Sequence, residues 1–158
     1  MIRIGSGWDL HRLVPSGKPL IIGGIEIPSK KGPLAHSDGD VLIHALIDAL
    51  LGALAKGDIG SHFPDTDPAY KDIDSMELLK SVLQQELPPY TIINVDATII
   101  LQVPKLRAHI DAIRENLSKN LSLPIEYISI KAKTAEQALG ELGSGDAIIA
   151  QVALLISG

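Results

Sequence analysis

Residues 36–56 have the sequence HSDGDVLIHALIDALLGALAK, and this stretch decides the fold. Nearly every position between residues 41 and 55 is apolar, and the exceptions in and around this run recur every four positions: Asp40, His44, Asp48, Gly52 and Lys56. This spacing predicts a helix that is buried on most sides and exposes one polar line. Either Asp38 or Asp40 can cap its first turn, and the glycines within residues 57–60 end it.

A second stretch, GWDLH at residues 7–11, lies in a predicted strand. Residues two apart on a strand point to the same face, so Asp9 and His11 present a carboxylate and an imidazole together. His44 on the helix adds a third ligand for a divalent metal and leaves a fourth tetrahedral position open. The sequence therefore predicts a catalytic metal site, held by histidine and carboxylate because the chain has no cysteine. From spacing alone, an ordinary hydrogen-bonded imidazole is an equal alternative for His44.

The rest of the chain is expected to alternate between strands and helices. Hydrophobic periodicity predicts strands at residues 2–13, 91–103, 127–134 and 147–156, a hairpin at 20–27, and helices at 74–87 and 106–121. Loops are expected at residues 28–34, 56–72 and 140–145. The last strand is apolar on nearly both faces, which is typical of a central strand. This order predicts one α+β domain of residues 1–158, in which helices pack on one face of a mixed β-sheet.

The opposite face of the sheet is expected to be too polar for the core of a monomer. Its polar positions lie on three of the predicted strands: Asn94, Asp96, Thr98, Ser129, Lys131, Lys133 and Gln151. Exposure to solvent is the simpler explanation, and an oligomer whose sheets face one another is the alternative. Ile92, Ile100 and Leu155, on or near the same face, favour the oligomer.

Composition and charge argue against several classes of protein. Apolar residues make up 46% of the chain but aromatic residues only 3%, so aliphatic side chains must build the core. The net charge of −5 argues against nucleic-acid binding. The longest apolar run, residues 41–55, is too short for a good membrane span, and residues 1–5 lack a signal-peptide pattern. We therefore expect a cytoplasmic protein that binds a small molecule rather than nucleic acid or a membrane.

Six motifs resemble one known enzyme family in their order and spacing: GWDLH at 7–11, IGG at 22–24, LAHSDGD at 34–40, GDIG at 57–60, FPDTD at 63–67 and NVD at 94–96. This is the 2-C-methyl-D-erythritol 2,4-cyclodiphosphate synthase family, and the resemblance extends from residue 3 to about residue 156. It implies an enzyme of the non-mevalonate isoprenoid pathway that cyclises 4-diphosphocytidyl-2-C-methyl-D-erythritol 2-phosphate and releases CMP. It also implies a homotrimer, with the polar sheet faces packed around the trimer axis and each active site between adjacent subunits.

The resemblance also implies roles for individual residues. Asp9, His11 and His44 match the ligands of one zinc ion per chain, and Glu136 matches the residue that holds a second divalent ion, Mg²⁺ or Mn²⁺, on the diphosphate. His36 and Thr134 match the catalytic residues that stabilise the transition state. The implied substrate-binding positions are Asp9, His11, His36, Ser37, Asp58, Ile59, Gly60, Phe63, Asp65, Asp67, Pro104, Lys105, Leu106, Ala132, Lys133, Thr134 and Glu136.

These positions fall into two groups that would hold different parts of the substrate. Residues 58–60 and 63–67 would line the methylerythritol side, whereas residues 101–107 and 132–136 would hold the cytidine and its phosphates from the neighbouring subunit. The substrate's own 2-phosphate would be the nucleophile, so no serine, cysteine or activated water is needed.

The chain departs from many bacterial members of the family after residue 132. Residues 133–136 are KTAE in place of TTTE, and residues 137–146 contain neither Phe nor Arg. The family's arginine near one mouth of the trimer's central cavity therefore has no evident counterpart. Two other functions are alternatives: a zinc phosphohydrolase with a nucleophilic water on the metal, and a non-catalytic trimeric protein that holds a prenyl ligand in the central cavity.

Overall fold

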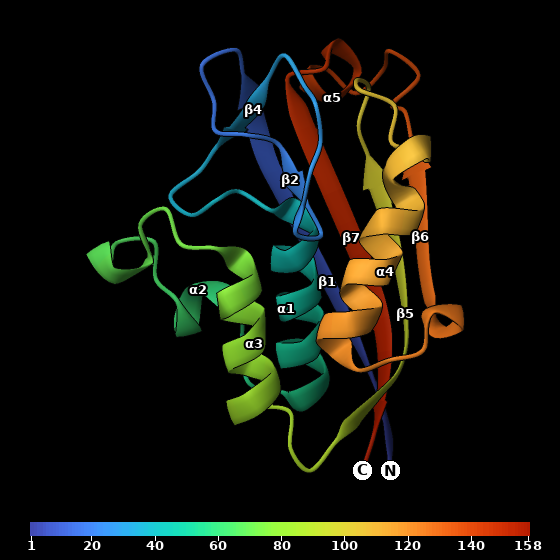
Figure 1. Cartoon of the computed structure of the whole chain (residues 1–158). Coiled ribbons are helices and arrows are strands. Elements are labelled where there is room, and N and C mark those ends of the chain that lie inside the picture. The colour runs from blue at the N-terminus through green and yellow to red at the C-terminus, as the bar shows by residue number, and fades with distance from the viewer.

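A five-stranded mixed sheet with helices on one face forms the molecule (Figure 1). The structure is a computed structural model, and it describes residues 1–158. The strands lie in the order β4 (Gly32–Leu34), β1 (Ile2–Val14), β7 (Ala147–Ser157), β5 (Thr91–Ile100) and β6 (Ile128–Lys133). All neighbouring strands are antiparallel except β5 and β6, which are parallel. The last strand of the chain, β7, is central, as its apolar sequence predicted.

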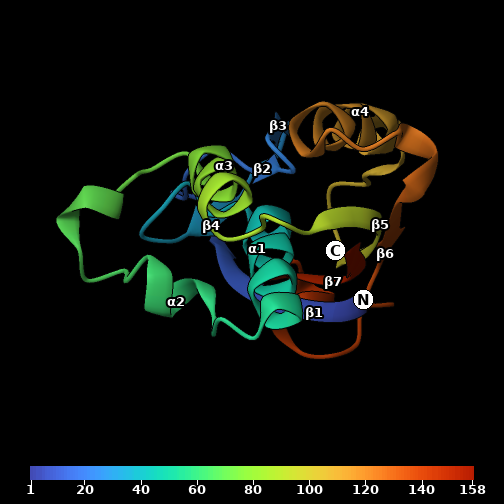
Figure 2. The ribbon, with the colours of Figure 1, turned by 90° about the horizontal axis from the view of Figure 1, so that it is seen from below.

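The three longest helices cover the same face of the sheet, as Figure 2 shows: α1 (Val41–Leu54), α3 (Ser75–Gln85) and α4 (Ile110–Leu121). The shorter elements are the hairpin β2 (Ile21–Ile22) and β3 (Ile25–Glu26), the helices α2 (Ile59–His62) and α5 (Glu141–Ser144), and 3₁₀ turns at Pro68–Tyr70, Arg107–His109 and Ile125–Tyr127. The predicted α+β class, with helices on one face of a mixed sheet, is confirmed. None of the helices has both the length and the apolar character needed to cross a bilayer.

Helix α1 lies at the centre of the helical layer, where it packs on β1 and β7 and against α3. Eleven of its 14 residues are buried, as the four-residue spacing of its exceptions predicted. Asp40 caps the helix, because its Oδ1 accepts from the backbone N–H of Ile43 at 3.1 Å. The same carboxylate accepts from the backbone N–H groups of Gly23 at 2.9 Å and Gly24 at 2.7 Å. One buried side chain therefore joins the β2–β3 hairpin to the first turn of α1.

Two glycines of β1 allow α1 to lie directly against the strand. A Cβ added at Gly5 would be 1.8 Å from the carbonyl oxygen of Ala49, and one added at Gly7 would be 1.8 Å from that of Ala45. No residue with a side chain fits at these distances, so glycine sets the separation between helix and sheet. This close approach brings the first turns of α1 beside the residues of β1 that follow Gly7.

The other face of the sheet is not covered by any helix of the chain (Figure 2). Asp96 on β5 and Lys131 on β6 lie on it, and their Oδ2 and Nζ atoms are 2.7 Å apart. The β1 part of the face is apolar instead, and Ile4 and Trp8 are 71% and 55% exposed. Trp8 pairs with Gln151 of β7, and Gln151 in turn pairs with Thr98 of β5. From β7 onward to β5 and β6, this face of the sheet is therefore polar. The polar positions on this face were predicted from the sequence, whereas the apolar row on β1 was not.

Regular structure occurs in all three segments that were predicted as loops, so those predictions were partly wrong. Residues 32–34 form β4, which pairs with the end of β1 and satisfies backbone groups that would be open at the edge of the sheet. Residues 56–72 contain α2 and a 3₁₀ turn, because the side chains of Asp58 and Asp67 cap two short helical segments. Residues 141–144 form α5. The predicted helix 106–121 begins as a 3₁₀ turn and becomes α-helical only at Ile110.

Candidate active site

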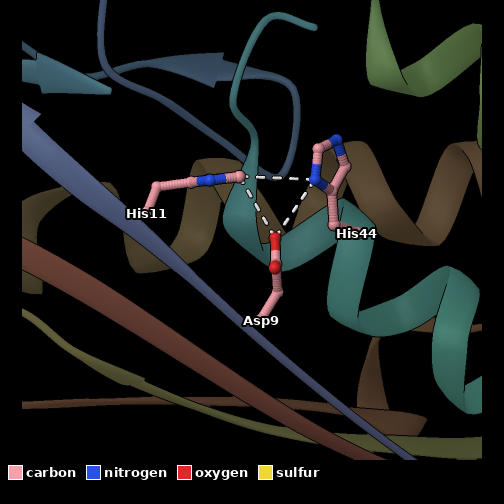
Figure 3. A group of neighbouring side chains, drawn as sticks. All are labelled: Asp9, His11 and His44. Carbon is pink, nitrogen blue, oxygen red and sulfur yellow. Dashed lines mark hydrogen bonds and ion pairs between the residues drawn. The ribbon is translucent and has the colours of Figure 1, made fainter. Parts of the chain in front are cut away.

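Asp9, His11 and His44 form one compact cluster of metal-binding atoms (Figure 3). Asp9 Oδ2 lies 3.1 Å from His11 Nε2 and 3.1 Å from His44 Nδ1, and the two nitrogens are 3.3 Å apart. Two ligands of a tetrahedral zinc ion with bonds of about 2.0–2.1 Å lie about 3.3 Å from each other. The three side chains therefore fit one face of a tetrahedral coordination sphere, and the proximity predicted from the strand and helix spacing is confirmed.

The charges around this cluster also suit a cation. Burial raises the pKa of Asp9, but the hydrogen bonds and charges of His11 and His44 lower it more, so the pKa falls to about 2. Burial lowers the pKa of His44, but Asp9, and more weakly Asp40 and Asp38, raise it above its usual value. Asp9 is therefore an anion at neutral pH, and the carboxylates near His44 favour positive charge at this point.

A cavity of about 490 Å³ lies beside the cluster, and His11 and His44 form part of its wall. Six further predicted site residues also line it: His36, Ser37, Ile59, Gly60, Phe63 and Asp65. Pro64 belongs to the loop that was predicted to line the methylerythritol side. The remaining lining residues were not predicted: Leu34, Ala35, Tyr70, Ile73 and Leu78. Tyr70 packs edge-on against Phe63, with ring centroids 5.4 Å apart. Two aromatic residues inside a loop were the sequence signal that could have identified Tyr70.

His36 is held at the cavity by contacts on both sides. Its Nε2 is 3.2 Å from the carbonyl oxygen of Asp67, and Lys18 Nζ donates to the carbonyl oxygen of His36 at 3.1 Å. Lys18 also donates to the carbonyl oxygen of Ser37 and lies 2.7 Å from Asp72 Oδ1. The lysine therefore fixes the backbone of two predicted substrate-binding residues. Nothing in the sequence around Lys18 indicated this role.

Asp58 and Asp67, which were predicted to bind substrate, are not among the residues that line this cavity. Asp58 Oδ1 accepts from the backbone N–H of Ser61 at 2.8 Å, and Asp67 Oδ1 accepts from that of Ala69 at 2.9 Å. Both carboxylates thus begin short helical segments of the loop that carries Phe63. Direct contact between these carboxylates and a ligand stays a prediction.

The other predicted site residues lie near the carboxyl ends of β5 and β6, on the side of the sheet away from β1 and β4 (Figure 1). Because these strands are parallel, their carboxyl ends meet at one edge. A second cavity of about 450 Å³ lies there, lined by Leu101, Lys105, Leu106, Arg107, Ala132, Lys133 and Thr134. It shares no lining residue with the first cavity. Within one chain, the two groups of predicted substrate-binding residues are therefore separate.

Two predicted residues border this second cavity without lining it. Glu136 follows directly, and its Oε1 accepts from Thr134 Oγ1 at 3.1 Å. Its side chain is exposed, and its backbone has a positive φ of 52°. Pro104 faces a different cavity together with Lys30 and Lys31. The structure thus places Glu136 beside Thr134, far from the Asp9 cluster, and a role for Glu136 in metal binding stays a prediction.

Comparison with known proteins identifies the family. The model of the YgbB family matches residues 2–157. The chain belongs to the YgbB family. Its relatives in this family include the 2-C-methyl-D-erythritol 2,4-cyclodiphosphate synthase of Burkholderia vietnamiensis, which is 55% identical over 155 residues, or 98% of this chain and 97% of that protein.

Solved structures of similar proteins have the same fold. A bifunctional protein from Campylobacter jejuni, IspDF, matches 99% of this chain with a TM-score of 0.92 and 38% identity, and this chain spans 42% of its length. A 2-C-methyl-D-erythritol 2,4-cyclodiphosphate synthase solved in a form bound to CDP matches 98% of this chain and 100% of its own, with a TM-score of 0.88 and 38% identity. At these identities the likeness supports a common family as well as a common fold.

Proposed function

We propose that this protein is a phosphorus-oxygen lyase, a 2-C-methyl-D-erythritol 2,4-cyclodiphosphate synthase. It cyclises 4-diphosphocytidyl-2-C-methyl-D-erythritol 2-phosphate and releases CMP, in the non-mevalonate pathway to isoprenoid precursors. One observation supports this most strongly. A three-ligand metal cluster, of which His11 and His44 line a cavity, occurs in a chain that is 55% identical, over nearly its full length, to a synthase of that name.

The proposed metal at Asp9, His11 and His44 is one zinc ion per chain. Two imidazole nitrogens and one carboxylate oxygen are a donor set that zinc accepts, and the spacing of the three atoms fits its tetrahedral geometry. When bound, the ion supplies a Lewis acid that neutralises phosphate charge. We assign a second divalent ion, Mg²⁺ or Mn²⁺, to Glu136 and the diphosphate of the substrate.

The residues around the first cavity would position the substrate for an internal reaction. An oxygen of the 2-phosphate forms a bond to the diphosphate phosphorus nearer the methylerythritol. The bond from that phosphorus to the bridging oxygen breaks, and CMP leaves with that oxygen. The apolar side chains of Ile59, Phe63 and Ile73 exclude water from the methylerythritol, which favours the internal phosphate over hydrolysis. His36 and Thr134 stabilise charge on the phosphorus oxygens in the transition state.

A homotrimer would complete the site. The cavity at Thr134 is separate from the metal cluster within one chain, so we propose that it faces the metal cluster of the next subunit and binds the cytidine there. The uncovered sheet face supports this assembly, because Ile4 and Trp8 expose large apolar surfaces on it. Asp96 Oδ1 on the same face is shielded from solvent and has no hydrogen-bond partner within the chain. A partner subunit against this face would cover Ile4 and Trp8 and could offer a hydrogen-bond donor to Asp96 Oδ1.

The comparisons support neither alternative function, since the curated relatives and the CDP-bound structure are named as synthases. A phosphohydrolase and a prenyl-binding protein are therefore not proposed further. We place the enzyme in the cytoplasm, as its sequence led us to expect, and fractionation of the source cells tests that location.

Turnover of the cytidyl substrate tests the proposed activity. The zinc-loaded protein should release CMP and form a cyclic diphosphate in equal amounts, and a chelator should abolish both. In water labelled with ¹⁸O the cyclic product should contain no solvent oxygen. A linear product that contains ¹⁸O would show that the protein is a hydrolase, and no CMP from any metal-loaded form would refute the proposal outright.

A further inference from the structure

His44 makes contacts through both of its ring nitrogens. Nδ1 points toward Asp9 and His11, whereas the other nitrogen points away from them (Figure 3). That nitrogen, Nε2, lies 2.9 Å from Ser75 Oγ and 3.1 Å from Ser37 Oγ. A neutral imidazole has one proton, so whichever nitrogen holds it decides whether Nδ1 can bind a metal.

The contacts of Ser75 determine which group donates in its bond to His44. Ser75 is the first residue of α3 and is completely buried. Its hydroxyl donates to Asp38 Oδ1, and its backbone N–H donates to Asp38 Oδ2 at 2.9 Å. Because the hydroxyl proton is used on Asp38, only the lone pairs of Ser75 Oγ are left for His44. His44 Nε2 must therefore donate, so in the neutral ring the lone pair of Nδ1 faces Asp9 and His11, where a metal would bind.

We propose that Ser75 and Asp38 are positioning residues for the metal centre, which fix the tautomer and the ring orientation of His44. The proposal rests on the zinc site of the proposed function. It assigns no contact with substrate to either residue. Partners of this kind behind a metal-binding histidine hold the ring in place and raise the affinity for the ion. The order is then Asp38, Ser75, His44 and metal, each linked to the next.

The same arrangement leaves the hydroxyl of Ser37 available to a ligand. Ser37 Oγ accepts from the backbone N–H of Gly39 at 3.2 Å, and it can share the proton of His44 Nε2 as a second acceptor. It has no acceptor for its own proton among these contacts, and Ser37 lines the cavity. With Ser75 holding His44, the Ser37 hydroxyl proton can therefore point to a phosphate oxygen of the substrate.

Backbone hydrogen bonds hold Ser75 in this place. The N–H of Asp38 donates to the carbonyl oxygen of Ile73 at 3.1 Å, and the N–H of Asp72 donates to that of His36 at 2.8 Å. Residues 36–38 are thus joined to residues 72 and 73, directly before the Ser75 contact in the chain. The end of the long loop after α1 closes directly behind the metal ligand, so the affinity for metal should depend on this junction.

Zinc affinity and the protonation of the His44 ring test the proposal without any assay of turnover. Zinc dissociation constants are measured by competition with a chromophoric chelator. The ¹⁵N chemical shifts of the ring nitrogens identify the tautomer in metal-free protein at a pH high enough for the ring to be neutral. Ser75→Ala should weaken zinc binding by about 10–100-fold. It should also remove the preference for a proton on Nε2. Ser75→Thr, which keeps the hydroxyl, should restore most of the affinity and the original ring shifts.

Ser61→Ala is the matched control. Ser61 also donates from its hydroxyl and its backbone N–H to one carboxylate, Asp58, at 2.6 Å and 2.8 Å. It does so at an exposed position in α2, and none of its hydrogen bonds involves His44. Its loss should leave zinc affinity and the His44 shifts unchanged. A general effect of removing a serine from a helix start would change both variants alike.

The possible outcomes separate this inference from the proposed function. If the wild-type protein does not bind zinc, the metal centre itself is refuted. If the wild type binds zinc but folded Ser75→Ala has the same affinity and the same ring shifts, only the positioning role is overturned. If Ser75→Ala does not fold, Asp38→Asn tests the positioning role instead. The backbone N–H and the hydroxyl of Ser75 both donate to the Asp38 carboxylate, and the amide N–H₂ of asparagine would face one of these two donors. Weaker zinc binding in that variant supports the proposal, and unchanged binding overturns it.

Discussion

The cavity beside the metal cluster and the cavity at the ends of β5 and β6 are built in different ways. His44 and Ser75, at the first, lie on helices packed into the core, and their polar atoms have partners within the chain. At the second, Lys105, Lys133 and Thr134 are exposed at the ends of strands. One chain therefore organises the metal half of the proposed site in advance, whereas the cytidine half needs another surface opposite it.

Removal of a metal ligand should have the largest effect. His44→Ala or Asp9→Ala should lose zinc and reduce turnover to background, because the two remaining ligand atoms cannot hold the ion at a fixed point. Metal analysis after dialysis and the release of CMP measure the two losses. Full retention of zinc by both variants would contradict the ligand assignment.

His36→Ala should separate catalysis from metal binding on the same side of the molecule. The His36 ring contacts the carbonyl oxygen of Asp67 and is not part of the metal cluster, so zinc should be retained. Turnover should fall by about 10²–10³-fold, the usual loss when one transition-state donor is removed. Steady-state kinetics and metal content check this together. Loss of zinc in the variant would mean that His36 supports the metal site instead.

Asp40 makes the organisation of the metal half dependent on pH. Burial raises its pKa to about 6, although three backbone N–H groups oppose this shift. The folded protein then binds a proton more readily than the unfolded chain between about pH 4 and pH 6, so stability decreases as the pH rises through that window. A shift from 3.8 to about 6 corresponds to about 3 kcal/mol in the free energy of unfolding.

Denaturation of metal-free wild type and Asp40→Asn at several pH values measures that dependence. The asparagine cannot titrate, so the difference between the two unfolding free energies isolates the carboxyl group. The wild type should lose stability relative to the variant from pH 4 to pH 7. A difference that is constant over this range would show that the three N–H donors hold the pKa of Asp40 near its ordinary value.

Mixed trimers test whether the two halves come from different chains. His44→Ala alters only the metal half and Thr134→Ala only the second cavity. When the two variants are co-expressed in equal amounts, about one interface in four should combine two intact halves. Activity should then recover to about a quarter of the wild-type value. Recovery no greater than the sum of the separate variants would place the whole site within one chain.

Sequence patterns identified the metal half well, because local geometry determines it. The four-residue spacing around His44 and the two-residue spacing of Asp9 and His11 each fix a direction in space, and the fold needed only to bring one helix to one strand. The central position of β7 followed in the same way from its apolar residues.

Contacts between distant segments could not be read from such patterns. Tyr70 and Ile73 reach the cavity because the loop after α1 folds back onto it, and Leu78 reaches it from α3, which follows that loop. Lys18 meets the backbone of His36 across a turn and β4. On β1, the large apolar residues Ile4 and Trp8 flank the small residues Gly5, Ser6 and Gly7, and hydrophobicity alone would turn Ile4 and Trp8 inward. The backbone of α1 occupies that side, so they face outward.

The glycines of β1 also determine which amino-acid substitutions the protein can tolerate in evolution. Contact between the backbones of α1 and β1 sets the distance from His44 to Asp9, and no leucine or isoleucine side chain lies between them at these points. Aliphatic residues elsewhere in the core can therefore be exchanged without moving the metal ligands. A library that randomises the leucines of α3 and α4 should yield many active sequences, whereas one that randomises Gly5 and Gly7 should return only glycine.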